Sequence, residues 1–240
     1  MTKFCSAIVR VVSFDAMDTI IGTKEPIRNV YSRVAGEFGF TVTPSDIATV
    51  FPSHMKKLSE SHPCFGHSSI GHFEWWRRIV QGCLREACDS RIPNEEADGI
   101  AKRLFDFYGS ADAWCIIDPE LKTVIEDLRR RGLGTAVVSN FDGRLKTILQ
   151  SMELYPLFDI VVASGEVGVE KPNQKIFDLV TKHYGLFSAS ALLHIGDNVE
   201  KDYKGALNFG ASALLFDPSS TNCDVHNDHK ISSFTQLKVK

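Results

Sequence analysis

The chain begins with a short apolar run and then changes to a long stretch with helical periodicity. Residues Ile8 to Phe14 are largely apolar and β-branched, which is typical of a strand covered on both faces of a sheet. From about Pro26 to Ser110, apolar residues recur at helical spacing and strand patterns are absent. Four helices are predicted in this stretch: residues 26–38, a helix that begins at the Thr43-Pro44-Ser45-Asp46 capping box, residues 73–87 and residues 93–108.

After Trp114, short apolar runs alternate with helix patterns. Strands are predicted at residues 134–139, 158–163, 192–195 and 213–216, and helices at residues 118–132, 143–152, 173–184 and 200–209. This alternation indicates βαβ units around a parallel sheet. The predicted fold class is therefore α/β, with a Rossmann-like three-layer core at residues 1–22 and 112–240 and an inserted α-helical domain at residues 23–111. The polar tail after Asp217 is expected to be partly loose.

Length and composition narrow the class of protein. The 240 residues, 43% of them hydrophobic, suit a core domain with an insertion. A formal charge of −3 without a basic block argues against a nucleic-acid surface or a polybasic membrane anchor. The six cysteines form no CxxC pair, and neither a signal peptide nor a bilayer-spanning run is recognisable. We therefore expect a soluble cytoplasmic protein, with a nuclear or other intracellular location left open and the oligomeric state unknown.

Polar residues follow the predicted strands at their carboxyl ends. Asp15 follows the first strand, Ser139-Asn140 the second and Asp197 the fourth, and Lys171 precedes the helix after the third. In a parallel sheet these ends converge on one crevice. Mg²⁺ prefers oxygen ligands and commonly takes one or two protein carboxylates beside a phosphate. A lysine and a hydroxyl suit the phosphate oxygens. The sequence therefore predicts a magnesium and phosphate site.

These motifs, in this order, resemble the haloacid dehalogenase superfamily. The likeness rests on Asp15 to Thr19, Val138-Ser139-Asn140, Lys171-Pro172 and Gly196 to Asp202, and it covers nearly the whole chain. The helical insertion is similar to the C1 cap that covers the active site in this family. The Trp75-Trp76 pair and the Val-Ser-Asn-Phe-Asp run at 138–142 are similar to one group in it, the haloacid dehalogenase-like hydrolase domain-containing protein 3 group.

The resemblance implies a role for each matched residue. Asp15 would be the nucleophile that forms an aspartyl-phosphate. Mg²⁺ would be bound by Asp15, the backbone carbonyl of Met17 and Asp197. Asp202 would lie near the metal or hold Lys171. The phosphoryl group would be bound or oriented by Ser139 and Thr19, with Asn140 beside them.

One position departs from the family's phosphatases. They carry an aspartic acid two residues after the nucleophile, as general acid and base, where this chain has Met17. General acid–base help is worth roughly 10²–10⁴ in rate. We expect slow turnover, with substrates that have good leaving groups least affected. Asp18 turns to the other side of an extended chain and is not expected to substitute.

Three functions therefore compete. The preferred one is a Mg²⁺-dependent phosphatase that acts on a small phosphorylated metabolite. The second is a catalytically silent protein that binds a phosphate or metabolite. The third is a 2-haloacid dehalogenase, which needs neither the acid nor a metal, but that class lacks the acid that Asp197 supplies here. A related phosphonatase would need a cap lysine as a Schiff base, and the nominal candidates are Lys24, Lys56 and Lys57.

Some residues have simpler explanations. Trp75 and Trp76 cannot share one face of a helix, so one is expected in the helical core and the other could roof the pocket, although packing alone is preferred for both. Two Cys/His sets lack a complete zinc spacing and are interpreted as coincidence: His62, Cys64 and His67, and Cys223, His226 and His229.

Overall fold

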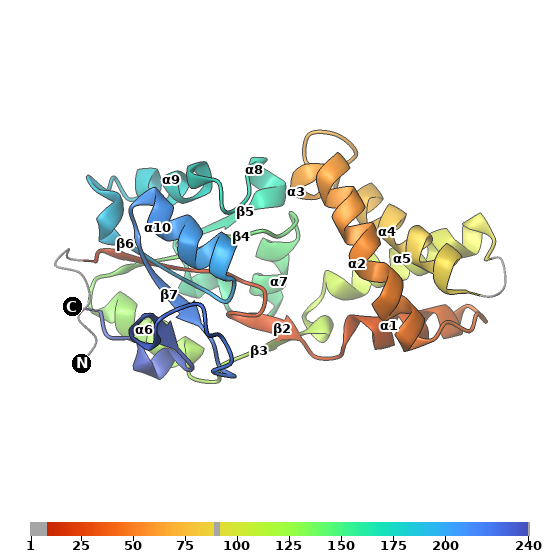
Figure 1. Cartoon of the computed structure of the whole chain (residues 1–240), viewed down its shortest axis with the longest axis horizontal. Helices are drawn as coiled ribbons and strands as arrows, with labels where there is room; N and C mark the ends of the chain where they lie inside the picture. Colours follow the sequence, from red (N-terminus) through yellow and green to blue (C-terminus); the bar gives the residue numbers. More distant parts are fainter. Residues whose placement is uncertain (1–8, 89–91, 240) are drawn as a thin grey trace.

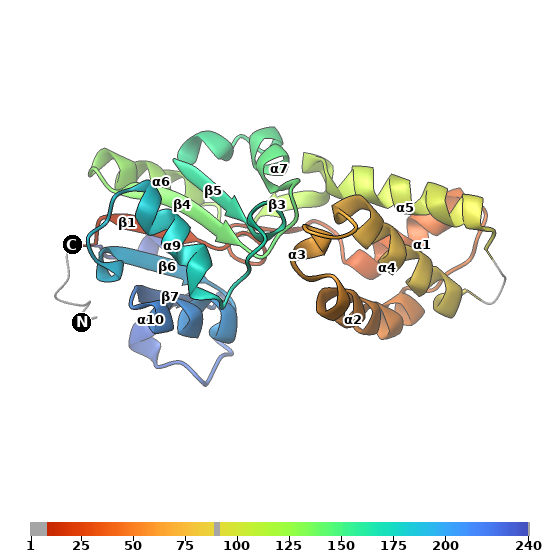
Figure 2. The same ribbon diagram turned by 90° about the horizontal axis from the view of Figure 1, so that it is seen from above.

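A parallel sheet forms the centre of the larger part of the molecule. The computed structural model describes residues 9–88 and 92–239. The sheet has the order β5-β4-β1-β6-β7-β8, and each neighbouring pair is parallel (Figures 1 and 2). Its strands are β1 (Val11–Phe14), β4 (Gly134–Ser139), β5 (Ile160–Ala163), β6 (Leu192–Gly196), β7 (Ser212–Phe216) and β8 (Lys230–Ile231). This order confirms the predicted α/β class and places β1 between β4 and β6.

Helices cover both faces of this sheet, as the three-layer prediction required. On one face α6 and α7 share a hydrophobic cluster with Val12 and Phe14, and on the other α9 and α10 pack with Val11. Successive side chains of β1 point to opposite faces of the sheet, so this strand contributes residues to both hydrophobic clusters. The helices are α6 (Leu121–Arg130), α7 (Leu145–Ser151), α8 (Ser164–Val167), α9 (Gln174–His183) and α10 (Gly205–Phe209), with a π-helical turn at Val199–Lys204. Short 3₁₀ turns occur at Ala111–Ala113, Tyr155–Leu157, Ala189–Ala191, Asn227–His229 and Phe234–Gln236.

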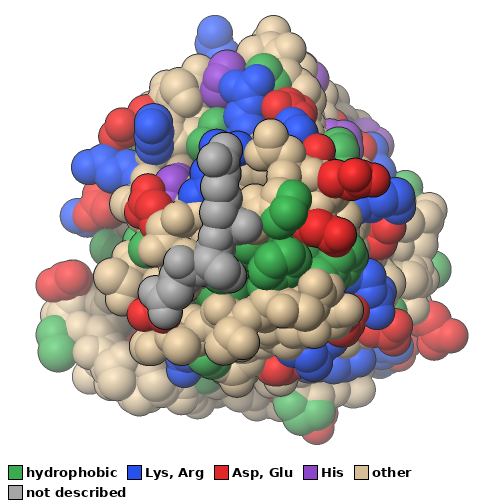
Figure 3. Space-filling model, turned by 90° about the vertical axis from the view of Figure 1, so that its right-hand side faces the viewer, with side chains coloured by type: hydrophobic (Ala, Val, Ile, Leu, Met, Phe, Trp, Pro, Cys, Tyr) green, Lys and Arg blue, Asp and Glu red, His purple; other side chains and the backbone are tan. Residues whose placement is uncertain are grey.

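A second group of helices extends from the sheet and has its own hydrophobic cluster. This helical bundle comprises α1 (Ile27–Glu37), α2 (Pro44–Ser61), α3 (Pro63–Gly66), α4 (His72–Ala87) and α5 (Asn94–Tyr108). The N-cap half of the predicted capping box is present, because the Thr43 hydroxyl accepts a hydrogen bond from the Asp46 backbone N–H at 3.2 Å. Figure 3 views the molecule from the outer end of the bundle, where acidic and basic side chains are interspersed on the surface.

The bundle joins the sheet through a two-stranded ribbon that the sequence did not predict. Strand β2 (Ile21–Thr23) pairs antiparallel with β3 (Trp114–Ile116). Both strands have three residues, which is too short for a period-2 pattern to stand out. The ribbon holds the two connecting segments side by side, so the chain passes from the sheet to the bundle and back at one place.

The expectation of a partly loose tail was wrong for residues 225–239. Strand β8 pairs with β7, and Phe234 is fully buried with its ring stacked on Phe216 at a centroid distance of 4.7 Å. The apolar residues of this segment are too widely spaced to form a periodic pattern. Ile8 and Cys5, which belong to the predicted first strand and the cysteine set, lie outside the described residues. Within the described ranges, no helix combines the length and hydropathy needed to cross a bilayer.

Candidate active site

Three carboxylates gather at the carboxyl edge of the sheet. Asp15 directly follows β1 and its backbone N–H donates to Ile195 of β6 at 2.8 Å, while Asp197 directly follows β6. One oxygen from each of Asp15, Asp197 and Asp202 lies within 4.8 Å of the others. In residues 9–88 and 92–239, this is the one cluster of three or more Asp, Glu, His or Cys side chains with that spacing. The strand order therefore brings together acids that are far apart in sequence.

Glycine at the end of β6 allows Asp202 to pack against the strand. A Cβ atom at Gly196 would lie 2.3 Å from the Asp202 carboxyl carbon. Oδ1 of Asp202 accepts from Lys171 Nζ at 2.5 Å and from His194 Nε2 at 3.1 Å, and Oδ2 accepts from the Asn198 N–H at 3.0 Å. Both oxygens of Asp202 are thus engaged by protein donors.

Lys171 is buried at the centre of the cluster. Its ammonium donates to Asp15 Oδ1 at 2.6 Å, to Asp202 Oδ1 at 2.5 Å and to the Val138 carbonyl at 2.7 Å, which uses all three donors. Burial alone would lower the pKa of Lys171, but Asp15 and Asp202 raise it above its usual value. The lysine is therefore charged and directed at the end of β1, as the sequence predicted.

Asn140 holds Lys171 in place. Its Oδ1 accepts from the Lys171 backbone N–H at 2.7 Å, and its Nδ2 donates to the Lys171 carbonyl at 2.9 Å. Both polar ends of the Asn140 side chain are thus used on the backbone that carries the lysine. This arrangement positions Lys171. The substrate-binding role expected for Asn140 stays a prediction, and Asn140 also lines the cavity between the bundle and the sheet.

The charges and donors of the cluster fit a divalent cation and a phosphate. Burial, followed by the charges of Asp15 and Asp202, raises the pKa of Asp197 to about 7, and burial raises that of Asp15. Three acids with one lysine leave an excess of negative charge, and carboxylate oxygens are the ligands that Mg²⁺ prefers. The buried Ser139 hydroxyl lies toward Asp15 but has no hydrogen-bond partner at ordinary distance in the described part of the chain. It is available to a phosphoryl oxygen.

The turn after Asp15 separates three side chains. Thr19 is buried and its hydroxyl donates to Asp197 Oδ1 at 3.3 Å. Asp18 takes a left-handed conformation with φ +57° and its side chain is exposed. Met17 is half-buried and faces a cavity that Asp18 does not line. Met17, and not Asp18, therefore faces the cavity, and the expectation that Asp18 does not replace the missing acid stays a prediction.

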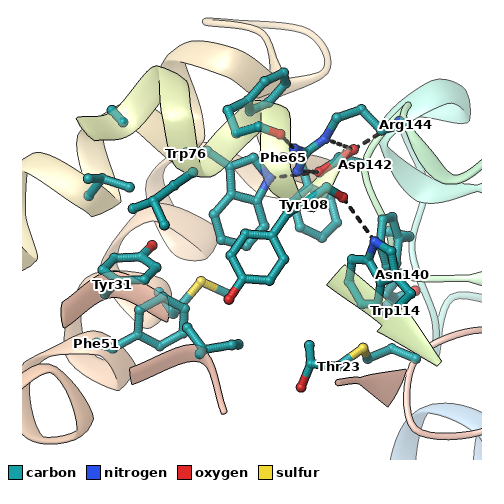
Figure 4. Close-up of a pocket in the computed structure, with 18 residues that line it drawn as sticks. Thr23, Tyr31, Phe51, Phe65, Trp76, Tyr108, Trp114, Asn140, Asp142 and Arg144 are labelled. Atoms are coloured by element: carbon teal, nitrogen blue, oxygen red, sulfur yellow. Dashed lines mark hydrogen bonds and ion pairs between the residues drawn. The ribbon is translucent and has the colours of Figure 1, made fainter. Parts of the chain in front are cut away.

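The cavity beside Met17 has a volume of about 220 Å³ and lies between the helical bundle and the sheet. Its walls are largely aromatic and aliphatic (Figure 4). Trp75 is buried in the bundle, as expected, whereas Trp76 lines the cavity and donates from Nε1 to Asp142 Oδ2 at 2.7 Å. Packing alone is therefore too simple an interpretation for Trp76. The three lysines considered for a Schiff base, Lys24, Lys56 and Lys57, do not line the cavity.

The sequence analysis missed two groups of residues near the site. His194 is fully buried between the Ser13 hydroxyl, 2.8 Å from Nδ1, and Asp202. Burial is the largest effect and lowers the pKa of His194, so the ring is neutral. The sequence does carry a signal for His194, because it is a histidine inside an otherwise apolar strand. Asp142 ends the Val-Ser-Asn-Phe-Asp run at 138–142, but nothing local to that run indicates that Asp142 and Arg144 contact the bundle.

The fold and the cluster define an α/β protein with an acidic, lysine-containing site at the carboxyl edge of a parallel sheet. A family model described as haloacid dehalogenase-like hydrolase matches residues 9–210, and the chain belongs to this family. The haloacid dehalogenase-like hydrolase domain-containing protein 3 of Bos taurus is 30% identical over 238 residues, which cover 95% of this chain and 92% of that protein.

Solved structures share the fold at low sequence identity. A 2-haloacid dehalogenase from Pseudomonas syringae pv. Tomato DC3000 matches with a TM-score of 0.68 and 19% identity, over 95% of this chain and 96% of that one. The HAD-hydrolase YfnB from Bacillus subtilis, solved bound to magnesium, matches with a TM-score of 0.68 and 18% identity, over 96% and 97% of the two chains. These likenesses support the architecture.

Proposed function

We propose that this chain is a Mg²⁺-dependent phosphatase that hydrolyses a small phosphate monoester through an aspartyl-phosphate at Asp15. The observation that carries the proposal is the Lys171 ammonium, which bridges Asp15 and Asp202 beside Asp197. A silent binding protein would not require a buried lysine aimed at the nucleophile. A dehalogenase would not require the excess of carboxylates.

In the proposed reaction, a carboxylate oxygen of Asp15 attacks phosphorus and the bond to the leaving oxygen breaks. Lys171 holds the attacking carboxylate in place, and Asn140 fixes Lys171. The unpartnered Ser139 hydroxyl donates to a phosphoryl oxygen, with Thr19 beside it. Water then hydrolyses the aspartyl-phosphate and releases inorganic phosphate.

The metal-binding residues are proposed from the same cluster. Asp15, Asp197 and the backbone carbonyl of Met17 would hold Mg²⁺. Asp202 would not bind the ion itself but would hold Lys171 in place. When bound, Mg²⁺ neutralises negative charge on the phosphoryl group and the carboxylates. The magnesium in the Bacillus subtilis relative of the same fold supports this choice of ion.

The helical bundle is proposed to act as a cap, with its domain bounds at residues 23–111. It lies over the cavity next to Met17, where it would exclude water during the reaction. Met17 supplies no proton, so turnover is slow for substrates with poor leaving groups. The proposed partner is a small phosphorylated metabolite, without nucleic acid or membrane, and the proposed location is the cytoplasm.

A panel of phosphate monoesters, assayed with Mg²⁺ and with a chelator, tests the proposal. Wild type should release phosphate slowly in the presence of Mg²⁺, and Asp15→Asn should not. Asp18→Asn is the matched control, because it removes an exposed carboxylate three residues away and should retain activity. If wild type binds vanadate but never releases phosphate, the protein is a silent binder. Metal-independent chloride release from 2-chloropropionate would instead identify a dehalogenase.

A further inference from the structure

The cavity between the helical bundle and the sheet is lined mainly by aromatic rings. The rings labelled in Figure 4 are those of Tyr31, Phe51, Phe65, Trp76 and Tyr108 from the bundle and Trp114 from β3. Phe105 and Phe141 also line the cavity. Aromatic walls favour aromatic ligands, since rings gain both burial and edge or offset contacts. The cavity therefore differs from a site for sugars or nucleotides, which needs many polar groups to replace lost water contacts.

The charged side chains in the cavity wall neutralise each other. Arg144 donates from Nε and Nη2 to Asp142 at 3.0 and 2.6 Å and from Nη1 to the Phe105 carbonyl at 2.6 Å. Its guanidinium carbon also lies 3.8 Å from the centre of the Phe105 ring. Asp142 in turn accepts from Trp76. Because Asp142 and Arg144 already satisfy each other, a charged ligand group beside them would be desolvated without compensation. The Tyr108 hydroxyl, which is buried without a partner in the described residues, leaves one polar contact in the wall for a neutral substituent of the ring.

The volume sets the size of the occupant. An engineered apolar cavity of about 150 Å³ is sufficient for benzene. The cavity here, at about 220 Å³, accepts one aromatic ring with small substituents. Extended or polycyclic groups would require the bundle to move away from the sheet.

Met17 is the residue of the cavity wall that lies nearest to Asp15 in the sequence. It lies two residues after Asp15, and its side chain lines the cavity. A thioether packs well against an aromatic ring but cannot donate a proton. Met17 therefore supplies no proton to a group that leaves into this cavity, which favours groups that leave as stable anions. Phenols, with a pKa of about 10 as in tyrosine, do this far more readily than alkyl alcohols.

We propose that the cavity receives the leaving group of the substrate and that this group is a single uncharged aromatic ring, so that the substrate class is aryl phosphates. This inference rests on the proposed phosphatase function. An Asp15 carboxylate oxygen forms the new bond to phosphorus, and the P–O(aryl) bond breaks with its electron pair retained by the aryloxide. The aryloxide takes its proton from solvent after release, and water hydrolyses the aspartyl-phosphate.

Three substrates separate ring binding from leaving-group acidity. Phenyl phosphate has the ring and the acidic leaving group, benzyl phosphate has the ring with an alkyl leaving oxygen, and acetyl phosphate has a good leaving group without a ring. With Mg²⁺, benzyl phosphate should share the low KM of phenyl phosphate but have a much lower kcat. Acetyl phosphate should have a KM at least tenfold higher than phenyl phosphate.

A binding measurement does not depend on turnover. Calorimetric titration of wild type with Mg²⁺ should show at least tenfold tighter binding of phenylphosphonate than of methylphosphonate, because one ring is buried. Phe51→Ala, in the cavity wall, should reduce this preference, and Phe187→Ala, a fully exposed phenylalanine elsewhere, should not. If Phe51→Ala does not fold, the wild-type comparison alone decides.

The outcomes separate this inference from the proposed function. Equal binding of the two phosphonates, or glycerol 2-phosphate turned over as efficiently as phenyl phosphate, overturns the aryl substrate class and leaves the phosphatase intact. A preference for phenylphosphonate without turnover of any phosphate overturns the phosphatase and supports the aromatic cavity as a binding site.

Discussion

The indole nitrogen of Trp76, on α4, lies 2.7 Å from Oδ2 of Asp142, in the segment that follows β4. Asp142 also accepts from Arg144, and Arg144 donates to the Phe105 carbonyl of α5 at 2.6 Å. Two helices of the bundle are thus tied to one point at the edge of the sheet, directly beside the cavity. These contacts stabilise the bundle in its position beside the cavity.

Removing the indole donor of Trp76 should weaken the contact between the bundle and the edge of the sheet. Trp76→Phe keeps a ring but loses the hydrogen bond to a buried carboxylate, which should cost about 1.5 kcal/mol of unfolding free energy. It should also favour a more open molecule, seen as a larger radius of gyration in small-angle X-ray scattering. Trp75→Phe is the control, since its indole donates within the bundle, to the Leu58 and His62 carbonyls. It should lower stability without increasing the radius, and an equal increase in both variants would contradict the role of Trp76.

The stability given by Asp142 should depend on pH. Burial would raise the pKa of Asp142, but the hydrogen bonds and charge of Arg144 hold it below the usual value. Its contribution is therefore complete above the unfolded-state pKa, about 3.9, and is lost as the pH falls through the folded-state pKa. Asp142→Asn should lower the unfolding free energy by about 3 kcal/mol at pH 6, and this difference should shrink below about pH 4. Urea unfolding across this range measures it; a difference that is constant with pH would contradict the ion pair.

Restoring a carboxylate at position 17 should help substrates with poor leaving groups. Met17→Asp places a proton donor at the cavity wall, so turnover of benzyl phosphate should rise by roughly 10²-fold or more, and that of phenyl phosphate by much less. Met17→Asn has nearly the same shape without the acid and should show no gain. Steady-state kinetics with both substrates make the comparison. Equal gains in Asp and Asn variants would mean that polarity, and not proton transfer, limits the wild type.

The tail should be a stabilising part of the core. Phe234→Ala removes a ring stacked on Phe216 and 5.6 Å from the ring centre of Phe14, which should cost about 3–5 kcal/mol. Phe187→Ala is the control because the side chain is fully exposed, and it should change stability by less than about 0.5 kcal/mol. Thermal unfolding of both variants tests this, and similar small shifts would show that the tail adds little.

Patterns that are local in the sequence predicted most of the helices and strands. The buried strand before Asp15, the alternation after Trp114 and the capping box at Thr43 each specify an element locally, and the carboxyl ends of parallel strands then bring the motifs together. The meeting of Lys171 with Asp15 could be predicted for this reason. Of the two roles expected for Asp202, near the metal or holding Lys171, the structure shows the contact with Lys171.

Other features depend on contacts that have no local signal. The ribbon β2–β3 is too short for a pattern, and Phe234 is buried only because β8 pairs at the edge of the sheet. The role of Trp76 depends on how the bundle docks against Asp142, which periodicity within either segment does not specify. His194 carries a signal, a polar side chain inside an apolar strand, but its partners Ser13 and Asp202 become apparent only in three dimensions.

The central claim is that Asp15 accepts the phosphoryl group. Because Met17 cannot activate water, hydrolysis of the aspartyl-phosphate should be slow and the intermediate should accumulate during turnover. Acid quenching of wild type mixed with phenyl phosphate and Mg²⁺, followed by peptide mass spectrometry, should locate one phosphoryl group on Asp15 and none on Asp18. Phosphate release without any modification of Asp15, or undiminished release by Asp15→Asn, would contradict the claim.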